Sequence, residues 1–205
     1  MVHGLANPGE QSRRPAPIWV VAGAPGAGKT TAARLLMEGL ADAGRPVPAL
    51  LDKDTLFGGF VAAILAAARH PPGEREGDWY DTHVKRHEYA GLTAAAREIS
   101  GYGCPVLLSA PFTGQIREPA RWEQWVRELG GGPVRLLYVR TDAETLANRL
   151  AERSSPRDDG KRADFGAFLA RMTPDVPPPV PHIAIDNRQS GAPLVDQLRE
   201  VIQRV

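Results

Sequence analysis

The chain has few of the features that mark secreted, membrane or nucleic-acid-binding proteins. Its 205 residues include a single cysteine, so no disulfide can form within the chain. The 25 basic and 24 acidic residues nearly cancel, whereas a nucleic-acid-binding surface needs a clustered excess of Lys and Arg. No apolar run approaches the roughly 18 residues of a membrane span, and residues 1–17 lack the apolar stretch of a secretory signal. We therefore expect a cytoplasmic domain without nucleic-acid or membrane partners, in which Cys104 is a small buried apolar residue.

Glycine and proline are frequent, with 21 and 19 residues, and they separate the periodic segments of the chain. Short apolar runs predict strands at 18–22, 47–51, 106–108, 134–139 and 182–185. Helical spacing and end signals predict helices at 30–43, 55–69, 80–100, 119–129, 143–152, 165–172 and 192–204. This alternation predicts a three-layer α/β domain over residues 17–205, with a five-stranded parallel sheet, helices on both faces and a flexible tail at 1–16.

A glycine-rich segment follows the first predicted strand. It reads Gly23-Ala24-Pro25-Gly26-Ala27-Gly28-Lys29-Thr30 and fits the pattern G-x-x-x-x-G-K-[ST]. The glycines let successive backbone N–H groups face phosphate oxygens, and the N-terminus of the next helix adds partial positive charge. Lys29 is expected to reach the β- and γ-phosphates, Thr30 to ligate Mg²⁺, and Thr31 to lie beside the nucleotide. The segment therefore predicts binding of a nucleoside triphosphate, which we take as ATP, with Mg²⁺.

Two carboxylates follow the second predicted strand. Ligands of an open α/β sheet lie beyond the carboxyl ends of its strands, and alternation along an extended backbone would turn Asp52 and Asp54 to one side and Lys53 away. Asp52 is predicted to hold the Mg²⁺ water shell, and Asp54 to accept a proton from an incoming hydroxyl. Which of the two is the base stays open, and Asp54 could instead only cap the helix that begins at Thr55.

A pair of arginines precedes a charged connector. Arg149 and Arg153 are four residues apart on one predicted helix, so both can contact one anion. The polar connector that follows contains Pro and Gly, which is typical of a mobile lid, and we place this lid at residues 153–165. The alternative is a solvated surface on which Glu152 and Asp142 pair with the arginines.

These features resemble those of small P-loop kinases that phosphorylate metabolites, a group that includes the AAA_33 family, shikimate and gluconate kinases, chloramphenicol phosphotransferase and the zeta-toxin-like proteins. The resemblance extends from Ile18 to Val205 and rests on the glycine-rich loop, the Asp-x-Asp pair and the Arg-x-x-x-Arg pair. It implies a nucleotide-kinase-like P-loop NTPase fold that transfers the γ-phosphoryl group of ATP to a hydroxyl of a small molecule. By this resemblance Lys29, Asp54, Arg149 and Arg153 are catalytic. Ser109 departs from the pattern, because several relatives carry Asp at the end of the third strand.

The resemblance leaves the acceptor unidentified. Phe57 and Tyr80 are predicted on the acceptor side, and Arg117 either binds an anionic group of the acceptor or covers a helix start. Asn187 and Arg188 follow the last strand, where relatives pack a loop against the adenine. Two alternatives stay open: an ATP-gated binding module with little transfer activity, or a kinase that acts on a nucleotide or nucleotide-sugar. The oligomeric state is not predicted.

Overall fold

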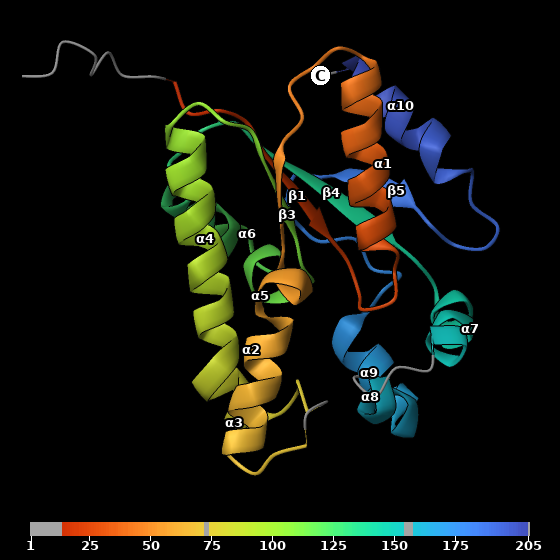
Figure 1. Ribbon diagram of the computed structural model, residues 1–205. Helices are drawn as coiled ribbons and strands as arrows, with labels where there is room; N and C mark the ends of the chain where they lie inside the picture. The colour runs from red at the N-terminus through yellow and green to blue at the C-terminus, as the bar shows by residue number, and fades with distance from the viewer. Residues whose placement is uncertain (1–13, 72–73, 154–157, 205) are drawn as a thin grey trace, which may run out of the picture.

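A computed structural model describes residues 14–71, 74–153 and 158–204 of the chain (Figure 1). Its sheet has the strand order β2-β3-β1-β4-β5, and all neighbouring strands are parallel. The strands are β1 (Ile18–Ala22), β2 (Ala49–Asp52), β3 (Val106–Ser109), β4 (Val134–Arg140) and β5 (Ile183–Asp186). The five-stranded parallel sheet predicted from the apolar runs is confirmed.

Helices connect the strands in the predicted order. They are α1 (Lys29–Asp42), α2 (Lys53–Ala67), α3 (Asp78–Tyr80), the π-helix η1 (Asp81–Lys85), α4 (Arg86–Gly101), α5 (Thr113–Ile116), α6 (Pro119–Glu128), α7 (Ala143–Arg153), α8 (Asp159–Ala163), α9 (Phe165–Met172) and α10 (Leu194–Arg204). Within the described ranges, no helix has the length and apolar character that crossing a membrane requires.

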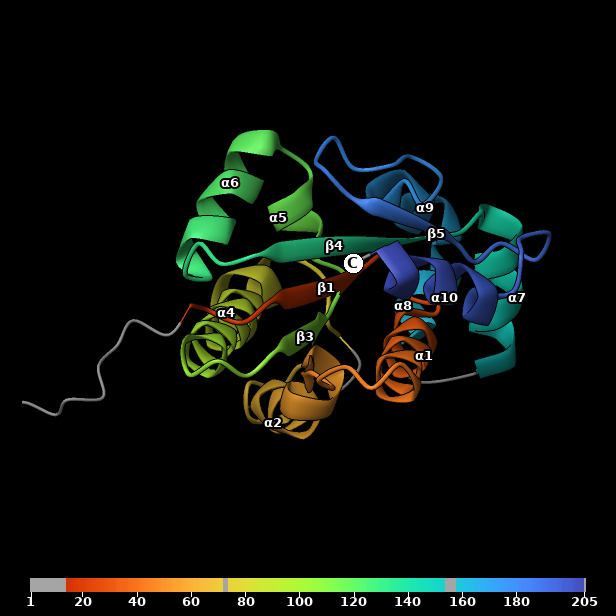
Figure 2. The same cartoon turned by 90° about the horizontal axis from the view of Figure 1, so that it is seen from above.

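The side chains of each central strand divide between two cores. Trp19 and Val21 of β1 pack with α1, α7, α9 and α10, whereas Ile18 and Val20 pack with α4, α5 and α6. This division follows from the two-residue period of a strand, which turns successive side chains to opposite faces of the sheet. Seen from above, α4 and α6 lie on one side of the sheet and α1 and α10 on the other (Figure 2). The result is the three-layer arrangement expected from the sequence.

Several local predictions need correction. Ala16, which the sequence assigned to a flexible tail, is buried, and its backbone exchanges hydrogen bonds with Ser100. Cys104 is exposed, because it lies in the turn between α4 and β3 and outside both cores. The helix predicted at 80–100 is interrupted by the π-helical segment η1, and α5 and α8 are too short for a periodic pattern to reveal them.

Candidate active site

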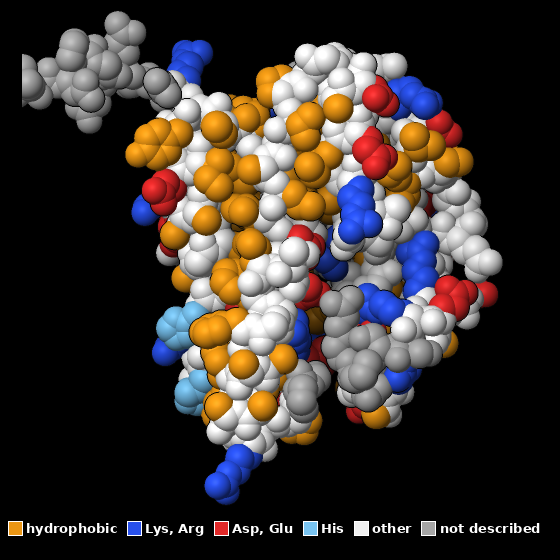
Figure 3. Space-filling model, viewed as in Figure 1, with side chains coloured by type: hydrophobic (Ala, Val, Ile, Leu, Met, Phe, Trp, Pro, Cys, Tyr) orange, Lys and Arg blue, Asp and Glu red, His pale blue; other side chains and the backbone are white. Residues whose placement is uncertain are grey.

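A large cleft lies beyond the carboxyl ends of β1, β2 and β3. Its volume is about 1360 Å³, and it extends from the phosphate loop to the side chains of α2, α4 and α6. Acidic and basic side chains gather in the hollow between α2 and α9 (Figure 3). Pro25, Gly26, Gly28, Lys29, Thr30 and Thr31 line one part of this cleft. The site predicted from the glycine-rich segment therefore lies where an open α/β sheet binds its ligands.

Two glycines of the loop occupy positions that a larger residue could not. Gly23 has φ 147°, and a Cβ there would lie 2.5 Å from the carbonyl oxygen of Val139. Gly28 has φ 96° and immediately precedes α1, and a Cβ there would lie 2.2 Å from Nδ2 of Asn187. Positive φ is strained for L-residues with a Cβ. These glycines therefore set the curvature of the loop.

Lys29 lies in the cleft and contacts the backbone of the loop. Its ammonium group donates hydrogen bonds to the carbonyl oxygens of Gly23 at 3.1 Å and Ala24 at 3.0 Å. Desolvation lowers the pKa of Lys29 to about 8, although the charges of Asp54 and Asp52 act in the opposite direction. An ammonium group in this environment gains from a bound anion, because a phosphate replaces the water that burial removed.

Arg149 and Asn187 support the loop from the side. Arg149 donates from Nη1 to the carbonyl oxygen of Ala27 at 3.2 Å and from Nη2 to that of Asn187 at 3.0 Å. The Asn187 side chain donates to the same Ala27 carbonyl at 2.7 Å. Partial burial lowers the pKa of Arg149, but a guanidinium stays charged at any neutral pH. Both residues therefore hold the loop backbone, and Arg149 also lines the cleft.

In the described part of the predicted lid, two cationic side chains pair with one buried carboxylate. Asp158 is fully buried, and it accepts hydrogen bonds from Arg153 Nε at 2.7 Å and Lys161 Nζ at 3.0 Å. Burial acts to raise the pKa of Asp158, but the hydrogen bonds from Arg153 and Lys161 outweigh it and lower the pKa below its usual value. All three residues line the cleft. Sequence reasoning did not single out Lys161, and residues 154–157 of the predicted lid lie outside the described residues.

Three oxygen-bearing side chains of the cleft have the chemistry of Mg²⁺ ligands. Thr30, Asp52 and Ser109 all line the cleft, and Asp52 and Ser109 are register partners on β2 and β3. Ser109 is 2% exposed, and its Oγ has no hydrogen-bond partner among the described residues. Hydroxyl and carboxylate oxygens are the ligands that Mg²⁺ prefers. Since the described residues contain no cluster of three His, Cys, Asp or Glu side chains, a metal ion here would depend on nucleotide phosphates for its remaining ligands.

Asp52 and Asp54 do not have the geometry expected of an extended backbone. The strand ends at Asp52, and α2 begins at Lys53. Asp52 caps α2, because its Oδ1 accepts hydrogen bonds from the Thr55 backbone N–H at 2.9 Å and the Thr55 hydroxyl at 3.1 Å. The alternative in which Asp54 is the cap is therefore wrong. Lys53 was expected to turn away, but it lines the cleft, because strand alternation no longer applies in the first turn of a helix.

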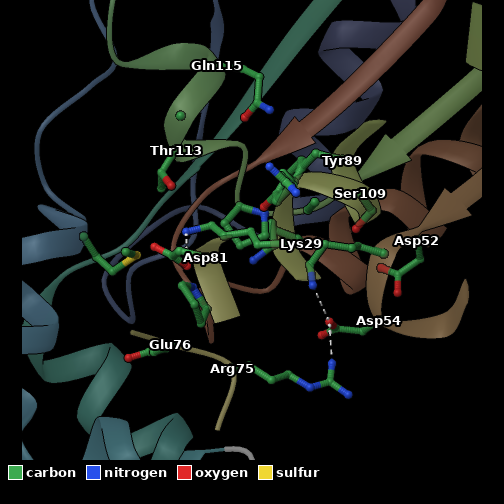
Figure 4. Close-up of a pocket in the computed structure, with 18 of the residues that line it drawn as sticks. Lys29, Asp52, Asp54, Arg75, Glu76, Asp81, Tyr89, Ser109, Thr113 and Gln115 are labelled. Atoms are coloured by element: carbon green, nitrogen blue, oxygen red, sulfur yellow. Dashed lines mark hydrogen bonds and ion pairs between the residues drawn. The ribbon is translucent and has the colours of Figure 1, made fainter. Parts of the chain in front are cut away.

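Asp54 lies between two cations. Lys53 Nζ and Arg75 Nη1 each lie 3.4 Å from Oδ1 of Asp54 (Figure 4). Arg75 also donates to the carbonyl oxygen of Gly58 at 2.8 Å, which fixes its guanidinium beside α2. The side chain of Asp54 is 45% exposed in the cleft. A carboxylate held in this way and reached by solvent can accept a proton from a ligand.

The remaining predicted residues differ in their positions. Tyr80 and Arg117 line the cleft, and the hydroxyl of Tyr80 donates to Glu88. Phe57 packs among apolar side chains of both the α4–α6 core and a smaller cluster around Val61 and Leu65. Its ring reaches Gly91 of α4, where a Cβ would lie 3.2 Å from Cζ of Phe57.

Arg188 is paired with a neighbour on the surface. Its guanidinium donates three hydrogen bonds to the carboxylate of Asp186, from Nη2 to Oδ2 at 2.6 Å and from Nε to Oδ1 at 2.9 Å and to Oδ2 at 3.1 Å. The hydrogen bonds of Asp186 to Arg188 lower the pKa of that carboxyl. Arg188 follows Asn187 in the chain, but the two side chains have different partners. Asn187 contacts the loop backbone at Ala27, whereas Arg188 contacts Asp186.

The strand order, the glycine-rich loop between β1 and α1, and the cleft at the strand ends define a P-loop NTPase fold of the nucleotide-kinase-like type. The chain belongs to the AAA domain family AAA_33, whose sequence pattern matches residues 18–174. A search of curated proteins by sequence finds no match.

Solved structures share the fold along nearly the whole chain. A protein of Chloroflexus aurantiacus that is assigned provisionally as a kinase has a TM-score of 0.65 at 19% identity, over 93% of this chain and 96% of that one. A gluconokinase from Sinorhizobium meliloti has a TM-score of 0.56 at 17% identity, over 94% of each chain. The APS kinase of Mycobacterium tuberculosis, solved with AMPPNP and APS, has a TM-score of 0.54 at 18% identity, over 93% of this chain and 98% of that one. At these identities the likeness establishes the fold.

Proposed function

We propose that this chain is a cytoplasmic kinase that transfers the γ-phosphoryl group of Mg-ATP to a hydroxyl group of a small molecule. The observation that carries this proposal is that Lys29 and Asp54 line the same cleft. They are near enough that the negative charge of Asp54 acts to raise the pKa of Lys29. A phosphate-binding cation and a solvent-reached carboxylate thus face the same space. The fold neighbours support the proposal, since gluconokinase and APS kinase are both kinases by name.

The size of the cleft supports binding of two molecules. Pockets for one drug-sized ligand measure about 300–1,000 Å³, and this cleft measures about 1360 Å³. A nucleotide at the phosphate loop therefore leaves room beside Asp54, Tyr80 and Arg117 for an acceptor.

The proposed transfer uses groups from both ends of the cleft. The acceptor oxygen forms a bond to the γ-phosphorus, the bond from that phosphorus to the β–γ bridging oxygen breaks, and ADP leaves with the electron pair. The proton of the acceptor hydroxyl passes to the carboxylate of Asp54. Lys29, Arg149 and Arg153 stabilise negative charge on the phosphates, and Lys161 adds a fourth cation on the same wall. Thr30 and Asp52, with Ser109 beside them, would hold Mg²⁺, which would supply positive charge against the phosphates of the nucleotide.

A ligand screen tests this proposal. Thermal unfolding is measured at fixed Mg-ATP across sugars, polyols, aminoglycosides, nucleosides and nucleotide-sugars, and each stabilising compound is then tested for ADP formation. A ligand at 100 times its dissociation constant stabilises the native state by about 2.7 kcal/mol, which a melting curve detects. A second ligand that both stabilises the protein and stimulates ADP formation supports the kinase and identifies its acceptor class, including a nucleotide or nucleotide-sugar.

Ser109 favours one second candidate, an ATP-gated binding module. Ser109 carries a hydroxyl at the strand end where several relatives carry a carboxylate. The proposed metal site therefore has one carboxylate, that of Asp52, beside the hydroxyls of Thr30 and Ser109. A nucleotide held without a complete metal site could be bound and switch a partner surface with little transfer. A melting shift with Mg-ATP, with no second ligand and no ADP above background, would support the gated module and contradict the kinase.

A further inference from the structure

Behind Asp54, the wall of the cleft contains an ion pair that the proposed transfer does not use. Lys53 Nζ lies 2.9 Å from Oε1 of Glu88, and the Tyr80 hydroxyl donates to Oε2 of the same carboxylate. Lys53 is 7% exposed, Glu88 3% and Tyr80 4%. The three side chains come from α2, α4 and α3, so this buried cluster joins the three helices that form the acceptor side of the cleft.

Stability alone is a weak reason for such a cluster. Removing two charges from water costs several kcal/mol, and replacing a buried ion pair by well-packed apolar side chains is often neutral or stabilising. Lys53, however, makes a second contact that an apolar side chain could not make, since its Nζ lies 3.4 Å from Oδ1 of Asp54.

Exposure falls steadily along the chain of contacts. The side chain of Asp54 is 45% exposed, that of Lys53 is 9% and that of Glu88 is 3%. The exposed carboxylate of Asp54 is the group that a ligand can reach, and the buried carboxylate of Glu88 is fixed among packed helices. Buried side chains of this kind have little rotamer freedom, so they can hold the exposed carboxylate in one orientation.

We propose that Lys53 is a positioning residue, whose ammonium group is fixed by Glu88 and Tyr80 and in turn orients the carboxylate of Asp54 toward the acceptor hydroxyl. This inference rests on the proposed function, in which Asp54 takes the proton of the acceptor. Reacting groups must be held close to their productive geometry, because small displacements reduce transfer strongly.

The first test separates positioning from stability. Lys53→Met leaves Glu88 as an uncompensated buried charge, so we expect it to lower both stability and ADP formation. The double variant Lys53→Met/Glu88→Gln removes both charges, so we expect stability in urea near that of the wild type but ADP formation at least about 30-fold slower, within the range for a misplaced general base. The affinity for AMPPNP should change less than about threefold, since neither residue belongs to the phosphate loop.

Arg199→Met, which breaks an exposed pair with Asp196 on α10, is the control and should match the wild type. A double variant that forms ADP as fast as the wild type would overturn the positioning role.

The second test needs no acceptor. ADP with aluminium fluoride mimics the transferring phosphoryl group, and a water molecule on the aluminium opposite ADP takes the place of the acceptor hydroxyl. The double variant should bind ADP alone as the wild type does, and ADP–aluminium fluoride at least about 10-fold more weakly. If this difference appears while no screened acceptor gives ADP, the assignment of a hydroxyl acceptor fails, but Lys53 still orients Asp54 toward the position of the transferring phosphoryl group. If the wild type is an active kinase and both affinities are unchanged in the double variant, the kinase proposal stands and the positioning role fails.

Discussion

The two halves of the cleft are built in different ways. The nucleotide half is centred on eight consecutive residues, 23–30, of which 23–28 curve between β1 and α1 and the last two begin α1. The acceptor half is formed by side chains from α2, the segment before α3, and α4, which are far apart in the sequence. The centre of the phosphate site is therefore specified by one short segment, whereas the proposed acceptor half depends on tertiary packing. Each prediction below affects one half and should spare the other.

The largest expected effect is on the nucleotide half. Lys29→Ala removes the cation that lies beside the phosphate position, so ADP formation should fall by at least about 10³-fold. The fold should persist, because among the described residues Lys29 donates hydrogen bonds to the loop carbonyls of Gly23 and Ala24 and to no distant element. ADP release and circular dichroism melting measure the two effects. A variant that unfolds at the temperature of the assay would show that the lysine also stabilises the loop.

A change in the acceptor half should spare nucleotide binding. Asp54→Asn keeps the shape of the side chain and removes its basicity, so ADP formation should fall by about 10²–10³-fold. The dissociation constant of AMPPNP, measured by calorimetry, should stay within about threefold of the wild type. Wild-type turnover in this variant would show that Asp54 is not the base, and would leave Asp52 as the candidate.

Two glycines provide a matched pair for the loop. Gly28 and Gly44 both have positive φ, 96° and 66°, but a Cβ on Gly44 would meet nothing within 4 Å. Gly44→Ala should cost about 1–2 kcal/mol from backbone strain alone. Gly28→Ala should cost at least about 1 kcal/mol more, because its Cβ would overlap Asn187, and should also weaken nucleotide binding. Urea unfolding measures both free energies, and equal losses would mean that Asn187 moves aside freely.

The smallest effect is a pH dependence of nucleotide affinity. The pKa of Lys29 is about 8 in the free protein, and a phosphate binds its charged form. Above pH 8 the free protein must take up a proton in order to bind, so affinity should fall by up to about tenfold for each further pH unit. The same shift makes the unfolded chain bind more protons between pH 8 and 10.5, so this group makes the free energy of unfolding rise with pH in that window. Calorimetry from pH 7 to 10 measures the affinity, and Lys29→Arg, which stays charged, should show a flat profile.

The sequence was a good guide where structure follows from local pattern. The apolar runs around Val20, Leu107 and Leu137 gave the parallel strands, because strands buried on both faces have no polar positions to obscure them. The order of the helices followed from Gly and Pro at their ends. The family was also recognised from the sequence, because the loop motif is contiguous.

The acceptor side was less predictable for a physical reason. The alternation argument for Asp52 and Asp54 assumed an extended backbone, but α2 begins one residue after Asp52. The partner of Lys53 could not be found either, since Glu88 is 35 residues away. The contact of Lys161 with Asp158 was missed because α8, which begins directly after Asp158, is too short to show periodicity. A buried Lys–Glu contact has no signature in a single sequence, because either residue alone is typical of a surface helix.

The position of β2 has a consequence for how such a protein changes over time. Among the described residues β2 is an edge strand that pairs with β3 alone. Most of the proposed acceptor side, from Lys53 to Gly101, is one continuous excursion of the chain between these two strands, whereas Arg117 follows β3. Insertions, deletions and substitutions there leave the register of β1 with β3 and β4 intact. A new acceptor can therefore be acquired by rewriting a single stretch of the gene, while the machinery that handles the nucleotide is inherited unaltered.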